Sequence, residues 1–410
     1  MKQEHIRIKR KETSIKLQAS EINSLRVKDI ERNAIRVYKD GKIGISGAVG
    51  SMSLEELKTQ AIANLASNIP YPYELEKNKK DHRNYTEKEY SETELMKLTE
   101  SILEALKEDH NDFIFSESVK SVQLDTSFSN TEGLDLRFTD QHLELGLIVK
   151  AKSSSNLFDT FIQWSGRSLD KERFIKFNKD FLTAERNKVE LPKGEKLPVF
   201  FLGLGTVGFF LIRQLNGETY SKKASLFDGK LGEKIFNEKI TINQNRNPQD
   251  SYSHFYDLEG VTNPNDIVPL IHKGILKNVF TDKKIATKFD IKHTGAAAGE
   301  YDDIPNLGYI NIQPEIDSFD ISKTIGSQPS VLCMVAAGGE VNADGNYATP
   351  VQASYLFDGK KIIGKLPEFN MSNNVFDILG KDYIGTFKSD ELYFGENVYI
   401  TGSYMEIKKP

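Results

Sequence analysis

Alternating apolar and polar residues in the first half of the chain predict strands joined by hairpins. Residues 15–19 alternate weakly, and residues 35–38 and 43–45 flank the segment Lys39-Asp40-Gly41-Lys42. Asp-Gly between two such runs is typical of a tight hairpin turn. Further strands are predicted over 121–128, 134–138 and 143–151, with a turn over 130–133.

Helical spacing of apolar residues marks three more segments of this half. Ser53 and Glu56 have the spacing of a capping box, and the apolar face that follows consists of Leu54, Leu57, Ala61 and Leu65. A second amphipathic helix is predicted over 91–106 and a third over 170–184. In the third, Phe174, Phe177 and Phe181 form one stripe, which we expect to pack into the core.

The second half begins after a polar segment, residues 185–196. A buried strand is predicted over 197–202 and a helix over 206–216, and short strands and turns follow His254. Both halves mix hairpins with helices, so the predicted class is α+β, with two to three amphipathic helices in a hairpin-rich first half and mainly antiparallel strands in the second. We expect an amino-terminal α+β domain, 1–190, and a mostly β domain, 191–410, around the helix 206–216.

Composition narrows the kinds of function. Among 410 residues the net charge is −5 and no basic stripe is present, so direct binding of nucleic acid is not expected. Cys333 is the single cysteine and lies in an apolar run, which predicts an inert buried thiol and excludes a disulfide or a multi-cysteine zinc site. The amino terminus lacks the apolar core of a signal peptide, and the longest apolar stretch, 197–212, contains glycines and is too short to span a membrane. A cytoplasmic protein without membrane contact is expected.

A glycine motif suggests one alternative function. Gly203-Leu204-Gly205-Thr206-Val207-Gly208 follows an apolar strand and opens a helix, and Asp228 stands where a Rossmann unit places its ribose-binding carboxylate. A nucleotide-binding enzyme is therefore one hypothesis. Against it, the required second strand, 224–227, is very short and hairpins follow. The favoured interpretation is a tight strand-to-helix turn with close packing of the helix.

Paired carboxylates suggest one further candidate site. Asp257 and Glu259 could meet His293, although no two of the seven histidines are four residues apart. The favoured interpretation of the carboxylates is a turn in which Asp257 accepts backbone N–H bonds and Gly260 has a positive φ. An isolated histidine such as His293 is more often structural. Arg213 and Glu218 could pair with each other or face a groove.

Several blocks, taken in order, resemble one protein family. They are residues 36–44, 221–234, 255–261, 273–277, 293–297 and 339–347. In this order they are similar to the conserved blocks of the TldD/PmbA family, with Ala296 at a position where that family usually has Asn. The resemblance covers the chain from about residue 34 to its end. It implies a cytoplasmic α+β member of a metalloprotease family, whose proteins are also called modulators of DNA gyrase.

The family has two branches, and the resemblance indicates which one this chain follows. The TldD branch has a His-Glu-x-x-x-His zinc motif on the central helix, and the PmbA/TldE branch lacks it. When Leu215-Asn216-Gly217-Glu218 is aligned with the family's Leu-Glu-Gly-Asp, the two ligand positions fall on Gly208 and Arg213 and the base falls on Phe209. None of these side chains can perform the zinc chemistry. The resemblance therefore implies a PmbA/TldE-like subunit that is inactive alone and binds no cofactor itself.

The same resemblance implies partners. A zinc-bearing TldD-like subunit, or a second copy of this chain, would form a dimeric protease that acts on unfolded peptides, with zinc only in the zinc-bearing partner. A stand-alone homodimer that binds peptides is a further alternative. Residues expected to line a peptide groove or to hold the family's motifs in place are Arg213, Glu218, Asp257, Glu259, Gly260, His293, Thr294, Gly295 and Asn342.

Overall fold

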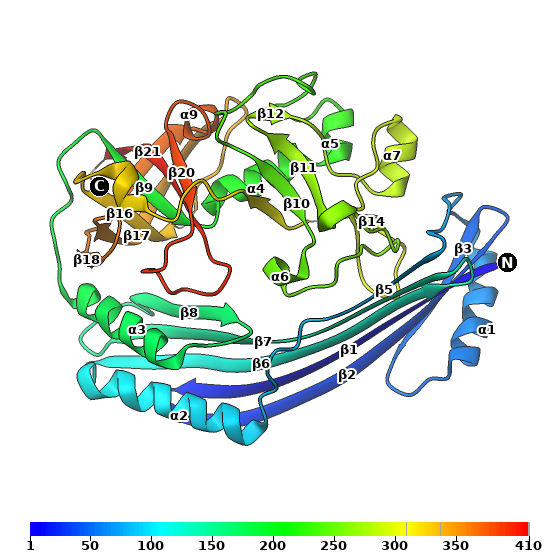
Figure 1. Ribbon diagram of the computed structural model, residues 1–410, viewed down its shortest axis with the longest axis horizontal. Coiled ribbons are helices and arrows are strands. Elements are labelled where there is room, and N and C mark those ends of the chain that lie inside the picture. Colours follow the sequence, from blue (N-terminus) through cyan, green and yellow to red (C-terminus); the bar gives the residue numbers. More distant parts are fainter. Residues whose placement is uncertain (309, 337, 409–410) are drawn as a thin grey trace.

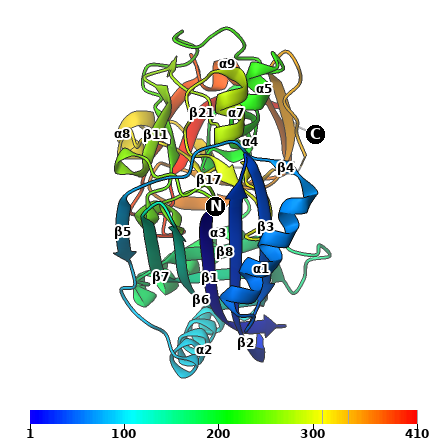
Figure 2. The same ribbon diagram turned by 90° about the vertical axis from the view of Figure 1, so that its right-hand side faces the viewer.

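Two long hairpins build the first half of the chain into one curved sheet (Figure 1). The computed structural model describes residues 1–308, 310–336 and 338–408. The strand order is β4-β3-β2-β1-β6-β7-β5, with β8 also pairing β7, and Figure 2 shows this order across the sheet. The strands are β1 (Lys2–Gln18), β2 (Glu21–Lys39), β3 (Lys42–Val49), β4 (Ile69–Pro70), β5 (Lys79–Asn84), β6 (Phe113–Asn130), β7 (Leu134–Ala151) and β8 (Thr160–Gly166).

The predicted hairpin and helices of the first half are confirmed. Asp40 and Gly41 join β2 to β3 with φ of 51° and 72°. Helix α1 (Leu54–Asn64) and helix α2 (Glu92–Asp109) both begin with complete capping boxes, at Ser53 and at Ser91. Helix α3 (Lys171–Arg186) has Asp170 as its N-cap, and its aromatic stripe lies in the core, with Phe177 half-buried. In the first helix Leu54 is exposed, so the predicted apolar face is narrower than expected.

The second half is organised around a closed ring of strands. The ring runs β16-β9-β21-β19-β17 and closes where β17 pairs β16; β18 and β20 extend it. Most of these pairings are antiparallel, as predicted, although β9 and β16 are parallel. The strands are β9 (Lys196–Leu202), β16 (Ser330–Ala336), β17 (Asn346–Phe357), β18 (Ile362–Lys365), β19 (Phe369–Asn374), β20 (Tyr383–Phe387) and β21 (Ile400–Lys408).

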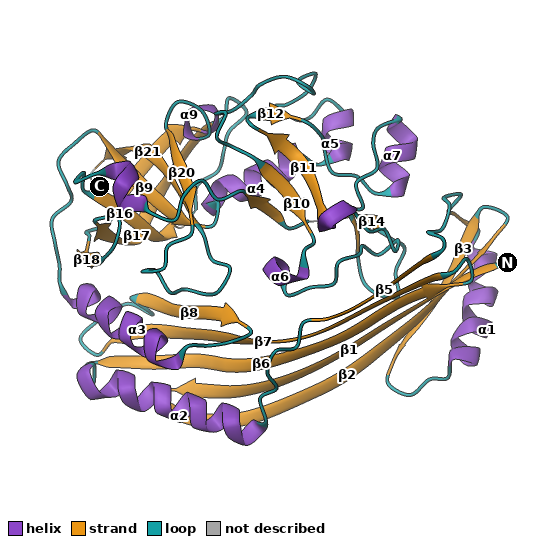
Figure 3. Cartoon of the chain, in the orientation of Figure 1, coloured by secondary structure: helices purple, strands orange, loops and turns teal. Residues whose placement is uncertain are grey.

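A second, smaller sheet and several short helices lie beside the ring (Figure 3). The sheet has the order β12-β11-β10-β15, and a separate pair is formed by β13 and β14. These strands are β10 (Ile242–Asn245), β11 (Ile267–His272), β12 (Ile275–Leu276), β13 (Ala297–Ala298), β14 (Asn306–Leu307) and β15 (Ile312–Pro314). The helices are α4 (Gly205–Gln214), α5 (Gly217–Ser221), α6 (Pro248–Ser251), α7 (Lys283–Phe289), α8 (Ile321–Ile325) and α9 (Val375–Ile378). The observed class is α+β throughout.

Buried and half-buried polar contacts join the two halves. Arg167, directly after β8, donates two hydrogen bonds to Asp140 of β7 (2.7 and 2.8 Å) and one to the carbonyl of Pro248 in α6 (2.6 Å). On β5, Arg83 pairs with Asp266 at 2.6 Å. Because Arg167 and Asp140 are desolvated, removing either one would leave the other buried without its counter-ion, which would destabilise the contact between the halves.

Three details differ from the sequence-based expectations. Strands β1 and β2 are much longer than residues 15–19 and 35–38, and β7 joins two predicted strands into one. Glu185, expected in a polar linker, is a buried residue at the end of α3 that accepts hydrogen bonds from Tyr355 and Lys365. Cys333 is buried, as predicted, and burial raises the pKa of its thiol to about 12.

Across the described residues, none of the helices combines the length and the apolar character that crossing a membrane requires.

Candidate functional site

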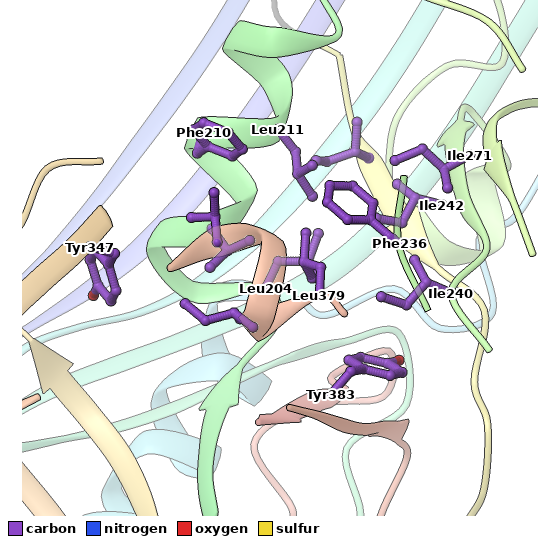
Figure 4. Packing of buried hydrophobic residues seen from close by; sticks show 14 of the residues in the cluster. Leu204, Phe210, Leu211, Phe236, Ile240, Ile242, Ile271, Tyr347, Leu379 and Tyr383 are labelled. Carbon is purple, nitrogen blue, oxygen red and sulfur yellow. The ribbon is translucent and has the colours of Figure 1, made fainter. Parts of the chain in front are cut away.

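A strand-to-helix turn places α4 against the core of the second half. Gly203 and Gly205 have φ of 61° and 54°, in the left-handed region that glycine tolerates best. Leu204, Phe210 and Leu211 belong to the buried cluster that also contains Phe236 and Ile242, and Figure 4 shows Leu211 on the side of α4 that faces these two residues. This arrangement agrees with the favoured interpretation of the glycines as a tight turn that lets the helix pack closely.

The structure also weakens the nucleotide hypothesis. Residues 224–227, which would have to form the second strand of a Rossmann unit, are a turn, and Asp228 lies exposed in the same turn. The neighbours of β9 in the sheet are β16 and β21, both from the last part of the chain. The glycine motif therefore lacks the β-α-β surroundings that dinucleotide binding requires.

The helix α4 presents side chains that do not fit a zinc ion. Gly208 is buried, and a Cβ placed there would lie 3.1 Å from the Cβ of Leu204. Phe209 is 75% exposed, and Arg213, four residues later, is exposed on the same side of the helix. Glycine and phenylalanine offer no ligand atom, and arginine is a permanent cation.

Asp257 closes a turn, as the sequence predicted. Its Oδ1 accepts hydrogen bonds from the amides of Glu259 and Val261, both at 2.9 Å, and its Oδ2 accepts one from Ala297 at 3.0 Å. Gly260 has φ of 73°, and a Cβ there would lie 2.6 Å from the Cδ2 of Leu134. Burial, and then the Glu259 carboxylate, raise the pKa of Asp257 to about 6.

The fold brings His293 to this turn, which the sequence left open. Ligand atoms of Asp257, Glu259 and His293 lie within 4.8 Å of one another, and His293 Nε2 is 3.6 Å from Glu259 Oε2. Glu259 also accepts hydrogen bonds from the Tyr71 hydroxyl (2.6 Å) and the Lys283 amide (3.0 Å). Burial alone would raise the pKa of Glu259, but the neighbouring His293, Tyr71 and Lys283 outweigh it and lower that pKa.

The contacts of Asp257, Glu259 and His293 are typical of a structural joint, a cluster that holds the surrounding loops together, rather than of a metal site. Both carboxylates are already bound by N–H and O–H donors, so a cation would have to displace several hydrogen bonds. Thr294 and Gly295 belong to the same joint: the Thr281 amide donates to the Thr294 hydroxyl at 2.7 Å, and Gly295 has φ of 69°.

Sequence reasoning missed the residues that connect this joint to the first half. Arg36 of β2 is fully buried and donates to the carbonyl of Leu258 at 2.5 Å. Its guanidinium lies 3.7 Å from Glu4 of β1, which also accepts a 2.6 Å hydrogen bond from Tyr38. A charged residue inside a predicted strand was the available signal.

The remaining candidate residues lie elsewhere. Glu218 pairs with Lys222 at 2.7 Å, so the hypothesis that it pairs with Arg213 is wrong. Asn342 holds a turn by accepting hydrogen bonds from the amides of Asp344 and Asn346, both at 2.9 Å, on the rim of a hollow of about 590 Å³. The nine candidates therefore fall into separate places, and only the group around Asp257 forms one cluster.

Comparison with known proteins identifies the family. Residues 195–408, more than half of the chain, match the family described as the PmbA/TldA metallopeptidase C-terminal domain. The chain belongs to the PmbA/TldD family.

Relatives of this PmbA/TldD protein include archaeal proteins. An uncharacterized protein of Methanocaldococcus jannaschii is 23% identical over 397 residues, which cover 90% of this chain and 88% of the relative. A protein named metalloprotease from Methanothermobacter thermautotrophicus is 27% identical over 159 residues, 38% of this chain and 34% of that protein.

Solved structures share the fold of this PmbA/TldD chain. The TldE structure from Thermococcus kodakarensis has a TM-score of 0.78 at 21% identity and covers 100% of this chain and 96% of its own. A candidate modulator of DNA gyrase from Thermotoga maritima has a TM-score of 0.75 at 18% identity, with 100% of this chain and 95% of that chain covered.

Glu4 makes the stability of this PmbA/TldD protein depend on pH. Burial raises the pKa of Glu4 from 4.5 to about 7, against the lowering effect of Arg36 and Tyr38. Because the folded pKa exceeds the unfolded one, the stability from this group is fully present below pH 4.5 and is lost as pH rises through about 7. We expect Glu4 to lower the free energy of unfolding by about 1–3 kcal/mol between pH 5 and pH 8.

Urea unfolding at the two pH values measures this step. The variant Glu4→Gln should lose the step, and Glu92→Gln, on the exposed side of α2, should keep it. An unchanged pH dependence in Glu4→Gln would contradict the assignment.

Proposed function

We propose that this chain is a non-catalytic, TldE-like subunit of a TldD/TldE-type metalloprotease that acts on peptides. The observation that carries the proposal is the surface of α4, where the family's zinc ligands would stand. Gly208, Phe209 and Arg213 offer neither a ligand nor a general base, so hydrolysis has to come from a zinc-bearing partner. Membership in the PmbA/TldD family and the TldE-like fold support the same proposal.

The exposure of Phe209 supports a partner at this helix. Phe209 is 75% exposed, whereas the neighbouring Val207, Phe210 and Leu211 of α4 are buried, so its ring is available to a partner that binds this helix. Arg213 beside it adds a planar cation, a residue type enriched in interfaces. A zinc-bearing paralogue whose own central helix faces α4 would cover both side chains.

Coexpression with such a paralogue tests the proposal. We expect the two chains to copurify, the pair to cleave unfolded peptides, and chelation to stop the cleavage. The pair should hold zinc in proportion to the paralogue, and the isolated chain should hold none. Stoichiometric zinc in the isolated chain, or cleavage by it alone, would refute the proposal, and a stable homodimer that ignores the paralogue would favour a stand-alone peptide-binding protein.

Phe209→Ser should weaken assembly with the paralogue. Removing a buried aromatic anchor from an interface costs about 2 kcal/mol or more, so affinity should fall at least about thirtyfold. Because Phe209 is exposed in this chain, its own unfolding should be nearly unchanged. The matched control is Phe319→Ser, which removes an aromatic ring that is 68% exposed directly before α8, a helix whose apolar residues pack in a different cluster from those of α4. Titration calorimetry measures both, and equal affinities would place the interface elsewhere.

A further inference from the structure

Part of β2 is an open edge of the large sheet. On one side β2 pairs with β1 along its whole length. On the other side β3 pairs only from Arg32 onward, and the Gly50 amide binds the carbonyl of Glu31. Among the described residues, no strand pairs with this outer edge over Glu21–Ile30. Open edges present unpaired backbone groups that can bind another strand.

The two faces of this edge differ in chemistry. Arg36 points toward the second half, and the unbroken register from residue 24 to residue 38 places Arg26 and Lys28 on that same face. Leu25 and Val27 lie on the opposite face, where Leu25 stands across from the buried Ile15 beside α2. They are 38% and 39% exposed. Arg26 and Lys28 therefore make one face of the edge cationic, with Ile30 beyond them. Leu25 and Val27 make the other face apolar, with Asp29 beyond them, 3.9 Å from Lys9 of β1.

The cations are only partly neutralised. Lys28 lies 3.8 Å from Glu12, which is also shared with Arg10 at 3.2 Å. Arg26 is exposed, and its partner in the β1 ladder is Ser14, an uncharged residue. Within the described part of the chain Arg26 forms no ion pair. A strand added beside β2 would place alternate side chains next to Arg26 and Lys28, where carboxylates are favourable.

A second copy of this chain fits the edge poorly. In an antiparallel, twofold pairing centred on Arg26, Leu25 meets Val27 but Arg26 faces its own copy. Shifting the centre to Val27 opposes Arg26 with Lys28 instead. Centring on Leu25 places Leu25 against its own copy and brings Glu21 opposite Asp29. Each of the three registers that bring apolar residues together therefore also brings like charges together. The charge pattern works against self-pairing and in favour of an acidic partner.

We propose that the Glu21–Ile30 edge of β2 binds an extended peptide whose acidic and apolar residues alternate. The peptide adds as a strand, its acidic side chains beside Arg26 and Lys28 and its apolar side chains beside Leu25 and Val27. Within the proposed function this edge is a holding site for acidic substrate segments. The inference rests on that function for the origin of the peptide, but its test needs neither the partner nor zinc.

Fluorescence anisotropy on the isolated full chain provides the test. The probe is a labelled synthetic peptide that alternates Glu and Val and is as long as the open edge. We expect it to bind at least about tenfold more tightly than an alternating Lys-Val peptide, or than a peptide of the same composition with its Glu and Val in separate blocks. Methylation of alternate backbone nitrogens should abolish binding, since it removes the strand hydrogen bonds.

Charge reversal then locates the site. Arg26→Glu with Lys28→Glu should weaken the Glu-Val peptide about tenfold or more and let the Lys-Val peptide bind. The matched control is Lys239→Glu with Lys277→Glu, which makes the same change in net charge on exposed positions of the second half. Gain of Lys-Val binding shows that the reversed protein is folded, and circular dichroism checks it independently.

Three results would overturn the inference: equal binding of all peptides, binding unaffected by the reversal at Arg26 and Lys28, or an equal effect of the control. Sedimentation of the isolated chain tests the remaining alternative, in which a second copy of the chain occupies the edge. If the chain self-associates and the reversed variant does not, the edge belongs to a second copy and the peptide proposal is wrong. Failure to copurify with a zinc-bearing paralogue would leave these measurements untouched, so the two proposals fail separately.

Discussion

Asp257→Ala is expected to destabilise the protein by about 3–5 kcal/mol without changing its metal content. The carboxylate accepts three backbone hydrogen bonds, and alanine would leave the amides of Glu259, Val261 and Ala297 buried without acceptors. Each buried N–H that loses its acceptor costs about 1–3 kcal/mol. The release of a carboxylate whose pKa is raised by burial offsets a part of this. Urea unfolding followed by circular dichroism measures the difference.

Two comparisons make that result specific. Asp257→Asn keeps one acceptor oxygen but turns an amide NH₂ toward one of the donors, so an intermediate loss is expected. Asp228→Ala changes an exposed turn aspartate and should stay within about 0.5 kcal/mol of the wild type. If Asp257→Ala were as stable as the wild type but lost a bound metal ion, the cluster with Glu259 and His293 would be a metal site rather than a structural joint.

Arg167→Ala is expected to cost about 3–5 kcal/mol, because it leaves a buried carboxylate without its counter-ion. The side chains of Arg167 and Asp140 are 5% and 0% exposed, and the guanidinium also binds the carbonyls of Pro248 and Gln249. The loss should be visible as a lower urea midpoint. Since this pair joins the halves, the variant should also be cleaved faster by proteases near α6.

Arg173 serves as a matched control that separates the effect of burying an arginine from the effect of losing its charge. Arg173 pairs with Asp390 at 3.9 Å and lies over the ring of Tyr393 at 4.2 Å, as Arg167 lies over Tyr252 at 4.8 Å. Its side chain is 41% exposed, so Arg173→Ala should cost less than about 1 kcal/mol. The double change Arg167→Met with Asp140→Leu should be milder than Arg167→Ala, since no charge is left unpaired. Equal losses at Arg167 and Arg173 would contradict the argument.

Features fixed by neighbouring residues could be predicted from the sequence. The capping boxes at Ser53 and Ser91 and the Asp40-Gly41 turn need contacts within a few residues, and each is present. The full lengths of β1 and β2 could not be predicted. Residues 23–29 of β2 are exposed on both faces, and the short alternation from Leu25 to Lys28 is too brief to indicate a strand as long as Glu21–Lys39. The ladder of this segment with β1 uses backbone groups that every residue has.

In the candidate site, too, contacts between neighbouring residues could be predicted from the sequence and contacts between distant residues could not. The turn at Asp257 follows from the local order Asp-x-Glu-Gly. The contacts of Glu259 with Tyr71 and of Arg36 with Leu258 join residues 188 and 222 positions apart, and no spacing rule reaches that far. His293 was a candidate because its chemistry suits a carboxylate, and only the fold shows that it lies beside Glu259.

The position of β21 has a consequence for how the protein is made. This strand, Ile400–Lys408, lies between β9 and β19 and also pairs β20, so it completes the ring of the second half. During synthesis β9 leaves the ribosome about two hundred residues before its partner β21. Until β21 is made, the apolar side chains of β9 stay exposed to solvent. Such distant pairing slows folding and favours aggregation of nascent chains. Chaperones that hold exposed apolar strands should therefore bind the nascent chain until β21 has been made and can pair with β9.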